Sequence, residues 1–268
     1  MIPKISQGEV QVRCPLDTII SYYLAEEARM TLTEKEIINK LEKIDTPTIS
    51  NVVATYPRSE NCMKLYDAWY GSWYTDQTIK CMYPEMGPKV GYVSTVVFCE
   101  RSEKYTGMSR WALPEHIDRT RKPVVLVAEQ QFPPELVNRV GLFGEIMTTQ
   151  YKALGVVGVI TNGPMRDIDA IKPMNFQYYA TGVTPGHGDF MVKAVDVPVT
   201  VGGMAVMPGD VVHMDLHGAV KFPASKMEEV LERALKLLES ESSTTRVYKD
   251  PEFTLKKWKQ SVDGTKSY

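Results

Sequence analysis

The sequence predicts an α/β fold, and three observations support this class. Short β-branched segments alternate with helical segments through the middle of the 268-residue chain. After residue 176 the pattern is mostly β until one last long helix. Neither a G-x-G-x-x-G motif after a strand nor a G-x-x-x-x-G-K-[ST] loop occurs, so a nucleotide-cofactor fold is not expected. The pattern therefore favours an α/β protein that is not a simple doubly wound sheet.

Two short helices are expected near the start of this region. Thr33 and Glu36 match a capping box, in which each residue satisfies a free amide of the other. A helical stripe of apolar residues follows, formed by Ile37, Ile38, Leu41 and Ile44. In the next segment Thr46 is predicted to cap a second helix with Pro47 at its first position, where proline is favoured.

The segment 56–86 is rich in aromatic residues and weak in periodicity. We interpret it as a core-covering insertion or an oligomer contact rather than a ligand-stacking site, because Trp and Tyr are common at interfaces. Strands are then predicted at 91–98 and 123–129, with a loop and a short helix in the 100–122 segment between them. A helix over 144–154 is expected to stop at Gly155.

The remaining elements complete the fold. A strand is predicted over VVGVIT, and short β segments over FQYYATG, VPVTVGG and DVVHMDLHGAVKFP. The last helix has apolar residues along one side, namely Met227, Val230, Leu231, Ala234, Leu237 and Leu238. The tail after Thr244 is polar, and we expect an arm or disorder there.

Composition limits the classes of partner. Hydrophobic residues make up 43% and charged residues 24% of the chain, as in soluble proteins with a real core. The net charge is −2 without a basic cluster, so no nucleic-acid partner is expected. No apolar run is long enough for a membrane span, and the N-terminus lacks a signal-peptide pattern. The four cysteines show no C-x-x-C spacing, which favours reduced thiols and a cytoplasmic location.

The segment VVGVITNGPMRD, residues 156–167, ends in an adjacent arginine and aspartate. Arg166 lies 21 positions after Glu145, past one helix and one strand. In an α/β unit this length returns the end of the strand to the start of the helix. We therefore expect Glu145, the amides of Ile146 and Met147, Arg166 and Asp167 to converge.

Each of these groups has a chemical use. Free amides at a helix start bind anionic groups, and an arginine fork matches a carboxylate. Asp167 is a hard oxygen ligand for Mg²⁺ or Mn²⁺, and Glu145 could orient a water or carry a proton. Taken alone, the pattern is weak and more often indicates a structural corner with a capping carboxylate and a surface arginine.

Several segments together resemble the RraA-like family, which includes 4-hydroxy-4-methyl-2-oxoglutarate aldolases and the regulator of ribonuclease activity A. The resemblance runs in order over roughly residues 35 to 240. Its motifs are DTPTISNVV (45–53), MGPKVGYVSTV (86–96), FGEIMTTQYKALGVVGVITNGPMRD (143–167), YYATGVTP (178–185) and VMPGDVVHMDLHGAVKFP (206–223). It implies a three-layer β/β/α domain with N-terminal helices and a C-terminal helix, assembled as a homotrimer or homohexamer.

The resemblance also implies roles for the converging residues. Arg166 and the amides of Ile146 and Met147 would hold the carboxylate of a 2-oxo acid. Asp167 would bind Mg²⁺ or Mn²⁺, and Glu145 would help a water act as acid or base. The implied reaction is carbon–carbon cleavage or decarboxylation of a 2-oxo or hydroxy acid through a metal-stabilised enolate.

Further acids belong to the family pattern. A second acid near the metal comes from the C-terminal helix of the neighbouring subunit, for which Glu239 and Glu241 are candidates; a solvated helix face is the alternative. Catalytic members often carry an acid three positions after the aspartate. Here Ala170 stands there, with Asp169 one position earlier.

His187 lies between two glycines in TPGHGDF. It is a candidate substrate contact on a mobile loop, and the alternative is an exposed histidine in a β-turn. His213 and His217 alternate along a predicted strand and are interpreted as structural.

The predicted organisation is an arm at 1–34, a catalytic domain at 35–243 and a tail at 244–268. The segments 56–86 and 100–122 are additions to the shared pattern. The competing hypothesis is a non-catalytic regulatory protein of the same family. A methyltransferase is disfavoured because no Gly-rich loop follows a strand.

Overall fold

The computed structural model describes residues 32–56, 59–103 and 106–263. Its contacts divide the chain into two compact units. The main unit spans Thr33–Ala234, and the described residues of the second unit are Leu32 and 235–263.

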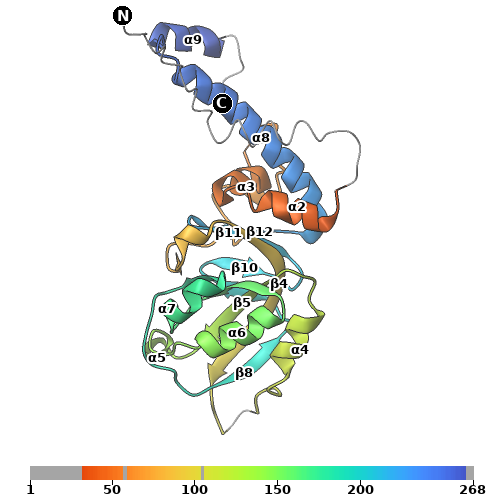
Figure 1. The fold of residues 1–268 in the computed structure, drawn as a ribbon, viewed down its shortest axis with the longest axis vertical. Coiled ribbons are helices and arrows are strands. Elements are labelled where there is room, and N and C mark those ends of the chain that lie inside the picture. The colour runs from red at the N-terminus through yellow and green to blue at the C-terminus, as the bar shows by residue number, and fades with distance from the viewer. Residues whose placement is uncertain (1–31, 57–58, 104–105, 264–268) are drawn as a thin grey trace, which may run out of the picture. The chain divides into compact units, whose positions relative to one another are not determined.

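The main unit is built on one mixed sheet (Figure 1). Its central strands β4, β5, β6 and β7 are parallel neighbours, and the outer strands pair antiparallel. Along the sheet the order is β12 (Gly218–Phe222), β11 (Val211–Asp215), β4 (Lys89–Glu100), β5 (Val124–Gln131), β6 (Val156–Thr161), β7 (Gln177–Ala180) and β3 (Lys80–Cys81), with β8 (Phe190–Val195) pairing β4. The strands predicted from the sequence in this region are confirmed.

The sheet is the middle of three layers. One face packs against the helical layer of α4 (Ala112–Arg119), α6 (Glu145–Ala153) and α7 (Ile168–Ile171) (Figure 1). The other face packs against the hairpin of β9 (Val199–Val201) and β10 (Met204–Val206). Each face of the sheet therefore has its own apolar core, and the predicted three-layer β/β/α fold is confirmed.

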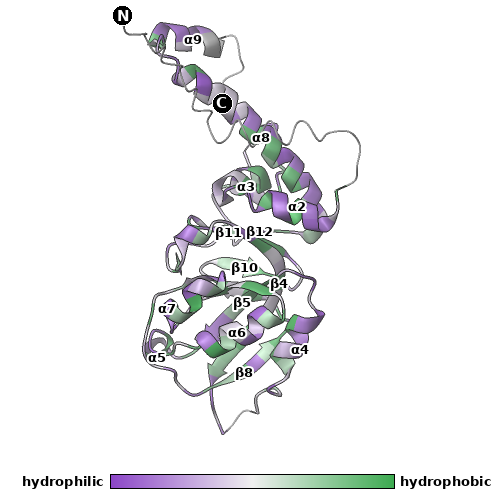
Figure 2. Ribbon diagram, viewed as in Figure 1, coloured by the Kyte–Doolittle hydropathy of each residue, from purple (hydrophilic) through white to green (hydrophobic). Residues whose placement is uncertain are grey.

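The burial of both faces explains the sequence of the central strands. Strand β4 is buried from Val90 to Phe98, and Figure 2 shows hydrophobic residues gathered in the central strands. Parallel strands covered on both sides read as continuous apolar runs rather than as alternating patterns.

The two predicted N-terminal helices are present. Helix α2 (Glu34–Leu41) has its capping box, with the Glu36 amide donating to Thr33 Oγ1 at 3.3 Å. Helix α3 (Thr46–Val53) is capped by Asp45, whose Oδ1 accepts from the Thr48 amide at 2.8 Å. The prediction that Thr46 is the cap was wrong by one residue, because Thr46 is already helical.

Short elements connect these parts. They are β1 (Ala54–Thr55), β2 (Tyr66–Asp67), α5 (Pro134–Val137) and the 3₁₀ turns η1 (Pro84–Met86), η2 (Lys172–Met174) and η3 (Ala224–Lys226). In the aromatic segment, Trp73 is buried and stacks on Tyr66 with ring centroids 5.6 Å apart. Trp69 and Tyr70 are instead exposed, so this segment both covers core and presents aromatic rings.

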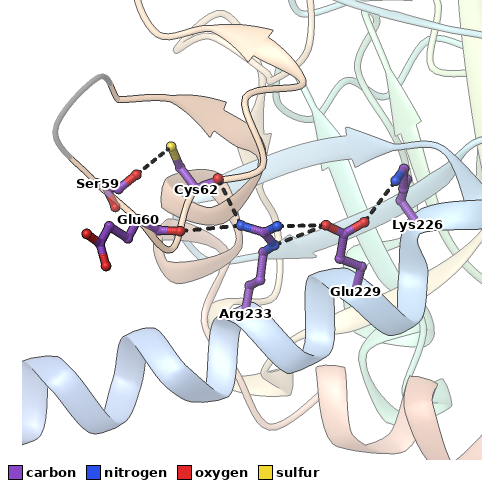
Figure 3. A network of polar contacts seen from close by, with 6 residues as sticks. All are labelled: Ser59, Glu60, Cys62, Lys226, Glu229 and Arg233. Atoms are coloured by element: carbon purple, nitrogen blue, oxygen red, sulfur yellow. Dashed lines mark hydrogen bonds and ion pairs between the residues drawn. The ribbon is translucent and has the colours of Figure 1, made fainter.

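The start of helix α8 (Met227–Tyr248) is tied to the chain near residue 60. Arg233 Nη1 donates to the carbonyl oxygen of Cys62 at 3.1 Å, and its Nη2 pairs with Glu229 at 2.9 Å (Figure 3). Glu229 also accepts from Lys226 at 2.8 Å. The Arg233 guanidinium contacts both the Cys62 carbonyl and the Glu229 carboxylate. Because it holds both groups at once, it fixes the register of helix α8 against the segment near residue 60.

The second unit continues along α8 and ends in α9 (Leu255–Asp263). The rings of Tyr248, Phe253 and Trp258 pack against one another with centroids 5.6 to 6.3 Å apart. Of the two alternatives for the tail after Thr244, disorder was therefore wrong for residues up to 263, because this aromatic cluster packs α9 against the end of α8, and an arm stays a prediction. Within the described residues, no helix combines the length and apolarity that a membrane crossing requires.

Candidate active site

Three chain segments meet beyond the carboxyl ends of β5, β6 and β7. Met165 bridges both Phe143 and Val183 in parallel fashion. The Arg166 amide donates to the Phe143 carbonyl at 2.8 Å, and the Thr184 amide donates to the Met165 carbonyl at 3.1 Å. Ligands of open parallel sheets commonly bind at this edge, so these segments frame the candidate site.

Asp167 lies directly against the start of helix α6. Its Oδ2 accepts a hydrogen bond from the Glu145 amide at 3.0 Å. A Cβ placed on Gly144 would lie 2.4 Å from the same oxygen. Gly144 therefore leaves the space that the carboxylate occupies, and the predicted approach of Asp167 to the helix start is observed.

The side chain of Arg166 lies on the same glycine-lined surface. A Cβ on Gly141 would lie 2.7 Å from Arg166 Cγ, and a Cβ on Gly144 would lie 3.5 Å from its Nη2. Its Nε is buried and has no hydrogen-bond partner among the described residues. No ion pair joins Arg166 to Asp167 in this part of the chain, so the pair is not a salt-bridged corner.

The first turn of α6 offers further donors. Glu145 uses its amide on Asp167, whereas the amides of Ile146 and Met147 donate no hydrogen bond within the described residues. Thr148 begins the regular ladder by donating to the Gly144 carbonyl at 3.0 Å. Two free amides at a helix start form a site for an anionic oxygen. The Glu145 side chain is exposed beside them.

A buried tyrosine holds the turn that carries Asp167. Asp167 has φ of +57°, a left-handed conformation that costs a non-glycine residue energy. The Tyr83 hydroxyl donates to the carbonyl of the next residue, Ile168, at 2.9 Å. Burial, with smaller contributions from Asp169 and Glu85, raises the pKa of Tyr83 to about 12. The hydroxyl therefore remains a donor at neutral pH.

A second buried tyrosine, Tyr178, supports the start of α6. Thr148 Oγ1 donates to the Gly144 carbonyl at 2.8 Å and lies 2.7 Å from the Tyr178 hydroxyl. All three residues are buried. This chain of contacts fixes Gly144, and through it the place of the Asp167 carboxylate.

His187 is not brought to the Arg166–Asp167 turn by any contact of the described residues. Its ring packs on Phe190 with centroids 5.4 Å apart, and Nδ1 lies 2.8 Å from the Gly188 carbonyl oxygen. The loop before it does reach the site, since the Gly141 amide donates to the Gly186 carbonyl at 2.9 Å. A role of His187 in substrate binding remains a prediction.

The further acids considered for a metal site are all exposed. Glu239 and Glu241 are exposed on α8 in the second unit, and their role remains a prediction. Asp169 is exposed one residue before Ala170. Among the described residues, no three His, Cys, Asp or Glu side chains gather as a metal-binding group.

Sequence reasoning did not identify several supporting residues. Gly141 and Gly144 act through close approach, for which the only signal was their spacing in GLFGE. Tyr83 contacts a residue 85 positions away and gave no signal, since it lies in the segment interpreted as an addition.

Comparison with known proteins identifies the family. The protein-family model for RraA-like proteins, described as Aldolase/RraA, matches residues 62–221. The chain belongs to the RraA-like family. The match begins inside the 56–86 segment and includes all of 100–122, both of which were expected to be additions to this pattern.

Individual relatives agree with this assignment. The chain is 30% identical over 108 residues to a Halalkalibacterium halodurans protein provisionally named 4-hydroxy-4-methyl-2-oxoglutarate aldolase, covering 40% of this RraA-like chain and 51% of the relative. The aligned part thus spans about half the length of that relative.

Solved structures show the same fold at lower identity. Streptomyces coelicolor RraAS2, titled an unusual member of the RNase ES inhibitor RraA family, is 21% identical with a TM-score of 0.61, over 81% of this chain and 99% of that one. A structure titled as novel cellulases from gut-associated microbes is 17% identical with a TM-score of 0.62, over 81% and 90%. Both likenesses concern the RraA-like fold alone.

Proposed function

We propose that this protein is a divalent-metal-dependent carbon–carbon lyase of the aldolase or decarboxylase type, acting on a 2-oxo or hydroxy acid. The observation that carries the proposal is the meeting of three groups over Gly144. They are the Arg166 guanidinium and the amides of Ile146 and Met147, none of which has a hydrogen-bond partner among the described residues, and the Asp167 carboxylate. The name of the Halalkalibacterium relative supports the same class.

Arg166 and the α6 amides suit the carboxylate of the substrate. A guanidinium binds a carboxylate through two parallel hydrogen bonds, and the buried Nε of Arg166 has no other partner in the described chain. The amides of Ile146 and Met147 add donors at the positive end of the helix. Together they orient the 2-oxo acid with its reacting carbons facing the exposed side of the site.

Asp167 fits the requirements of Mg²⁺ or Mn²⁺. Its carboxylate is exposed, and within the described residues only Oδ2 accepts a hydrogen bond, from the Glu145 amide. Mg²⁺ is commonly held by one or two carboxylates and keeps several waters, so a single fixed aspartate suffices to anchor it. When bound, the ion supplies positive charge that lowers the energy of an enolate derived from the substrate. Glu239 or Glu241 of a second subunit is proposed to complete the site in a homotrimer or homohexamer.

Glu145 is assigned the proton transfers. In aldol cleavage its carboxylate takes, through a water, the proton of the substrate hydroxyl, and the bond between the hydroxyl-bearing carbon and the neighbouring carbon breaks. The electron pair of that bond passes into the enolate of the 2-oxo product, which then takes a proton at carbon. In decarboxylation the bond to the carboxylate carbon breaks instead, CO₂ leaves, and the electron pair of that bond passes into the enolate of the 2-oxo product, which then takes a proton at carbon.

Oxaloacetate with purified protein tests the proposal. We expect pyruvate to form faster than with Mg²⁺ or Mn²⁺ alone, to cease with a chelator, and to fall at least about 100-fold in Arg166→Ala, since a lost charged contact is worth several kcal/mol. Arg119→Ala removes an exposed arginine of α4 and is the matched control.

The alternative is a regulatory protein without catalysis. Ala170 favours it, because the aldolase pattern has an acid there. Pyruvate formation equal to the metal-only rate, unchanged by Arg166→Ala, would exclude the lyase and leave this alternative.

A further inference from the structure

A cavity of about 730 Å³ lies beside the candidate site in the main unit. Helices α4 and α6 and strand β8 contribute to its walls, and Figure 1 shows these three elements next to one another. Its size is within the range of cavities that bind small molecules. The groups proposed for catalysis do not occupy this cavity, so the proposed reaction does not account for it.

The floor of the cavity is apolar and largely aromatic. Phe98, Leu113 and Tyr151 line it and are almost fully buried. Phe190 packs edge-on against Phe98 with centroids 5.6 Å apart. Such a surface favours a flat ring or a branched alkyl group.

The charged groups around the cavity balance one another. Arg101 is paired with Asp189 at 2.9 Å. Arg110 lies over the Trp111 ring at 4.4 Å from its centroid, and Glu103 is the acid among the lining residues. Among the described residues around the cavity, Arg101 and Arg110 are offset by Glu103 and by Asp189, the partner of Arg101, so the cavity does not favour a second substrate carboxylate.

Met147 connects the cavity with the candidate site. Its amide is one of the two free donors at the start of α6, and its side chain lines the cavity together with Gln150 and Tyr151 of the next turn. The loop from Gly186 to Phe190 makes a second connection. Gly186 bonds Gly141 beside Arg166, whereas the His187 ring packs on Phe190.

We infer that this cavity receives the distal part of the substrate, and that this part is an uncharged aromatic or branched alkyl group. The inference rests on the proposed function, because the orientation of the substrate follows from its carboxylate at Arg166. A substrate held there extends past Met147 into the cavity. The preferred substrates are then 4-hydroxy-2-oxo acids with an apolar group at C4, rather than dicarboxylates.

Binding of unreactive analogues tests the cavity without turnover. 4-Phenyl-2-oxobutanoate lacks the hydroxyl needed for aldol cleavage, and 2-oxobutanoate lacks the ring as well. By titration calorimetry with Mg²⁺ present, we expect the phenyl compound to bind at least about tenfold tighter, as apolar pockets discriminate by this order. In Gln150→Trp the new ring occupies the cavity, and the ratio of the two Kd values should fall toward one.

Asp118→Trp places the same side chain at an exposed position of α4 outside the lining, and it should keep the wild-type ratio. Equal Kd values for the two acids in the wild-type protein, or a ratio unchanged by Gln150→Trp, would overturn the inference.

Turnover separates this inference from the proposed function. With 4-hydroxy-4-phenyl-2-oxobutanoate, cleavage gives pyruvate and benzaldehyde, and its kcat/KM should exceed that of 4-hydroxy-4-methyl-2-oxoglutarate at least about tenfold. Oxaloacetate turnover without a preference for the phenyl compounds would refute the assignment of the cavity and support the proposed lyase activity. Tight binding of the phenyl analogue without turnover of any substrate would refute the lyase activity and support the assignment of the cavity.

Discussion

The Tyr83 hydroxyl donates a hydrogen bond to the Ile168 carbonyl oxygen at 2.9 Å, across 85 positions of the chain. This bond ties the segment before β4 to the turn that carries Arg166 and Asp167. Since Asp167 is held in a left-handed conformation, the residue that follows it must be fixed for its carboxylate to stay against α6.

Tyr83→Phe should therefore weaken the metal binding proposed for Asp167. We expect a severalfold rise in the Kd for Mn²⁺, measured by calorimetry, and a loss of about 1 kcal/mol in the free energy of unfolding, typical of one hydrogen bond. Tyr179→Phe is the control, because its hydroxyl donates to Gly218 at 3.2 Å away from the candidate site. Equal effects of the two variants on Mn²⁺ binding would argue against a positioning role.

Gly144→Ala should displace the Asp167 carboxylate. The φ of Gly144 is −135°, so alanine meets no backbone strain, but its Cβ would lie 2.4 Å from Asp167 Oδ2. We expect metal affinity and kcat/KM for oxaloacetate to fall at least about tenfold, with little change in Tm, because a misplaced ligand costs more in function than in stability. In an Asp167→Ala background the same glycine change should have no further effect. A further loss there would show that Gly144 acts through another group.

His213 should make the protein less stable at mildly acidic pH. Burial lowers the pKa of His213, and bonds to Thr46 and Leu41 surround its ring. A histidine whose pKa is lower in the folded protein than in the unfolded chain contributes its full stabilisation at pH values above its unfolded pKa of about 6.5. That contribution is lost as the pH falls below this value toward the folded pKa.

Urea denaturation at pH 7.5 and 5.5 measures this loss. The difference in the free energy of unfolding between pH 7.5 and pH 5.5 should be smaller in His213→Gln than in the wild-type protein. Part of it should remain, because burial also lowers the pKa of His116. His217→Gln, at the exposed hairpin turn, is the control, and an unchanged difference in His213→Gln would refute the assignment.

Asp45→Ala should destabilise the main unit by about 1 kcal/mol, the usual cost of losing an N-cap. The carboxylate accepts the Thr48 amide at 2.8 Å. Asp45→Asn keeps an acceptor and should lose much less. Chemical denaturation of both variants checks the order, and equal losses would mean that the charge rather than the cap is responsible.

Local patterns predicted the elements well because they depend on neighbouring residues. The capping box of Thr33 and Glu36, the helix stop at Gly155 and the apolar runs of β4 to β6 each follow from short-range rules. The same rules gave the approach of Asp167 to α6, since the length of one helix and one strand fixes where the chain returns. They failed at Thr46, where two adjacent residues could each cap. They also left disorder open after Thr244, where a contact among three aromatic rings stabilises a helical end.

The sequence by itself determined the α/β class, the family and the grouping of Glu145, Arg166 and Asp167, because periodicity, spacing and motif order carry that information. Only the tertiary structure decided that Arg166 has no ion-pair partner in the described chain, that Gly144 makes room for Asp167, and that Tyr83 fixes the turn. It also revealed the apolar cavity beside Met147. These features arise from side chains that are distant in sequence and meet only when the sheet and its helical layer have packed.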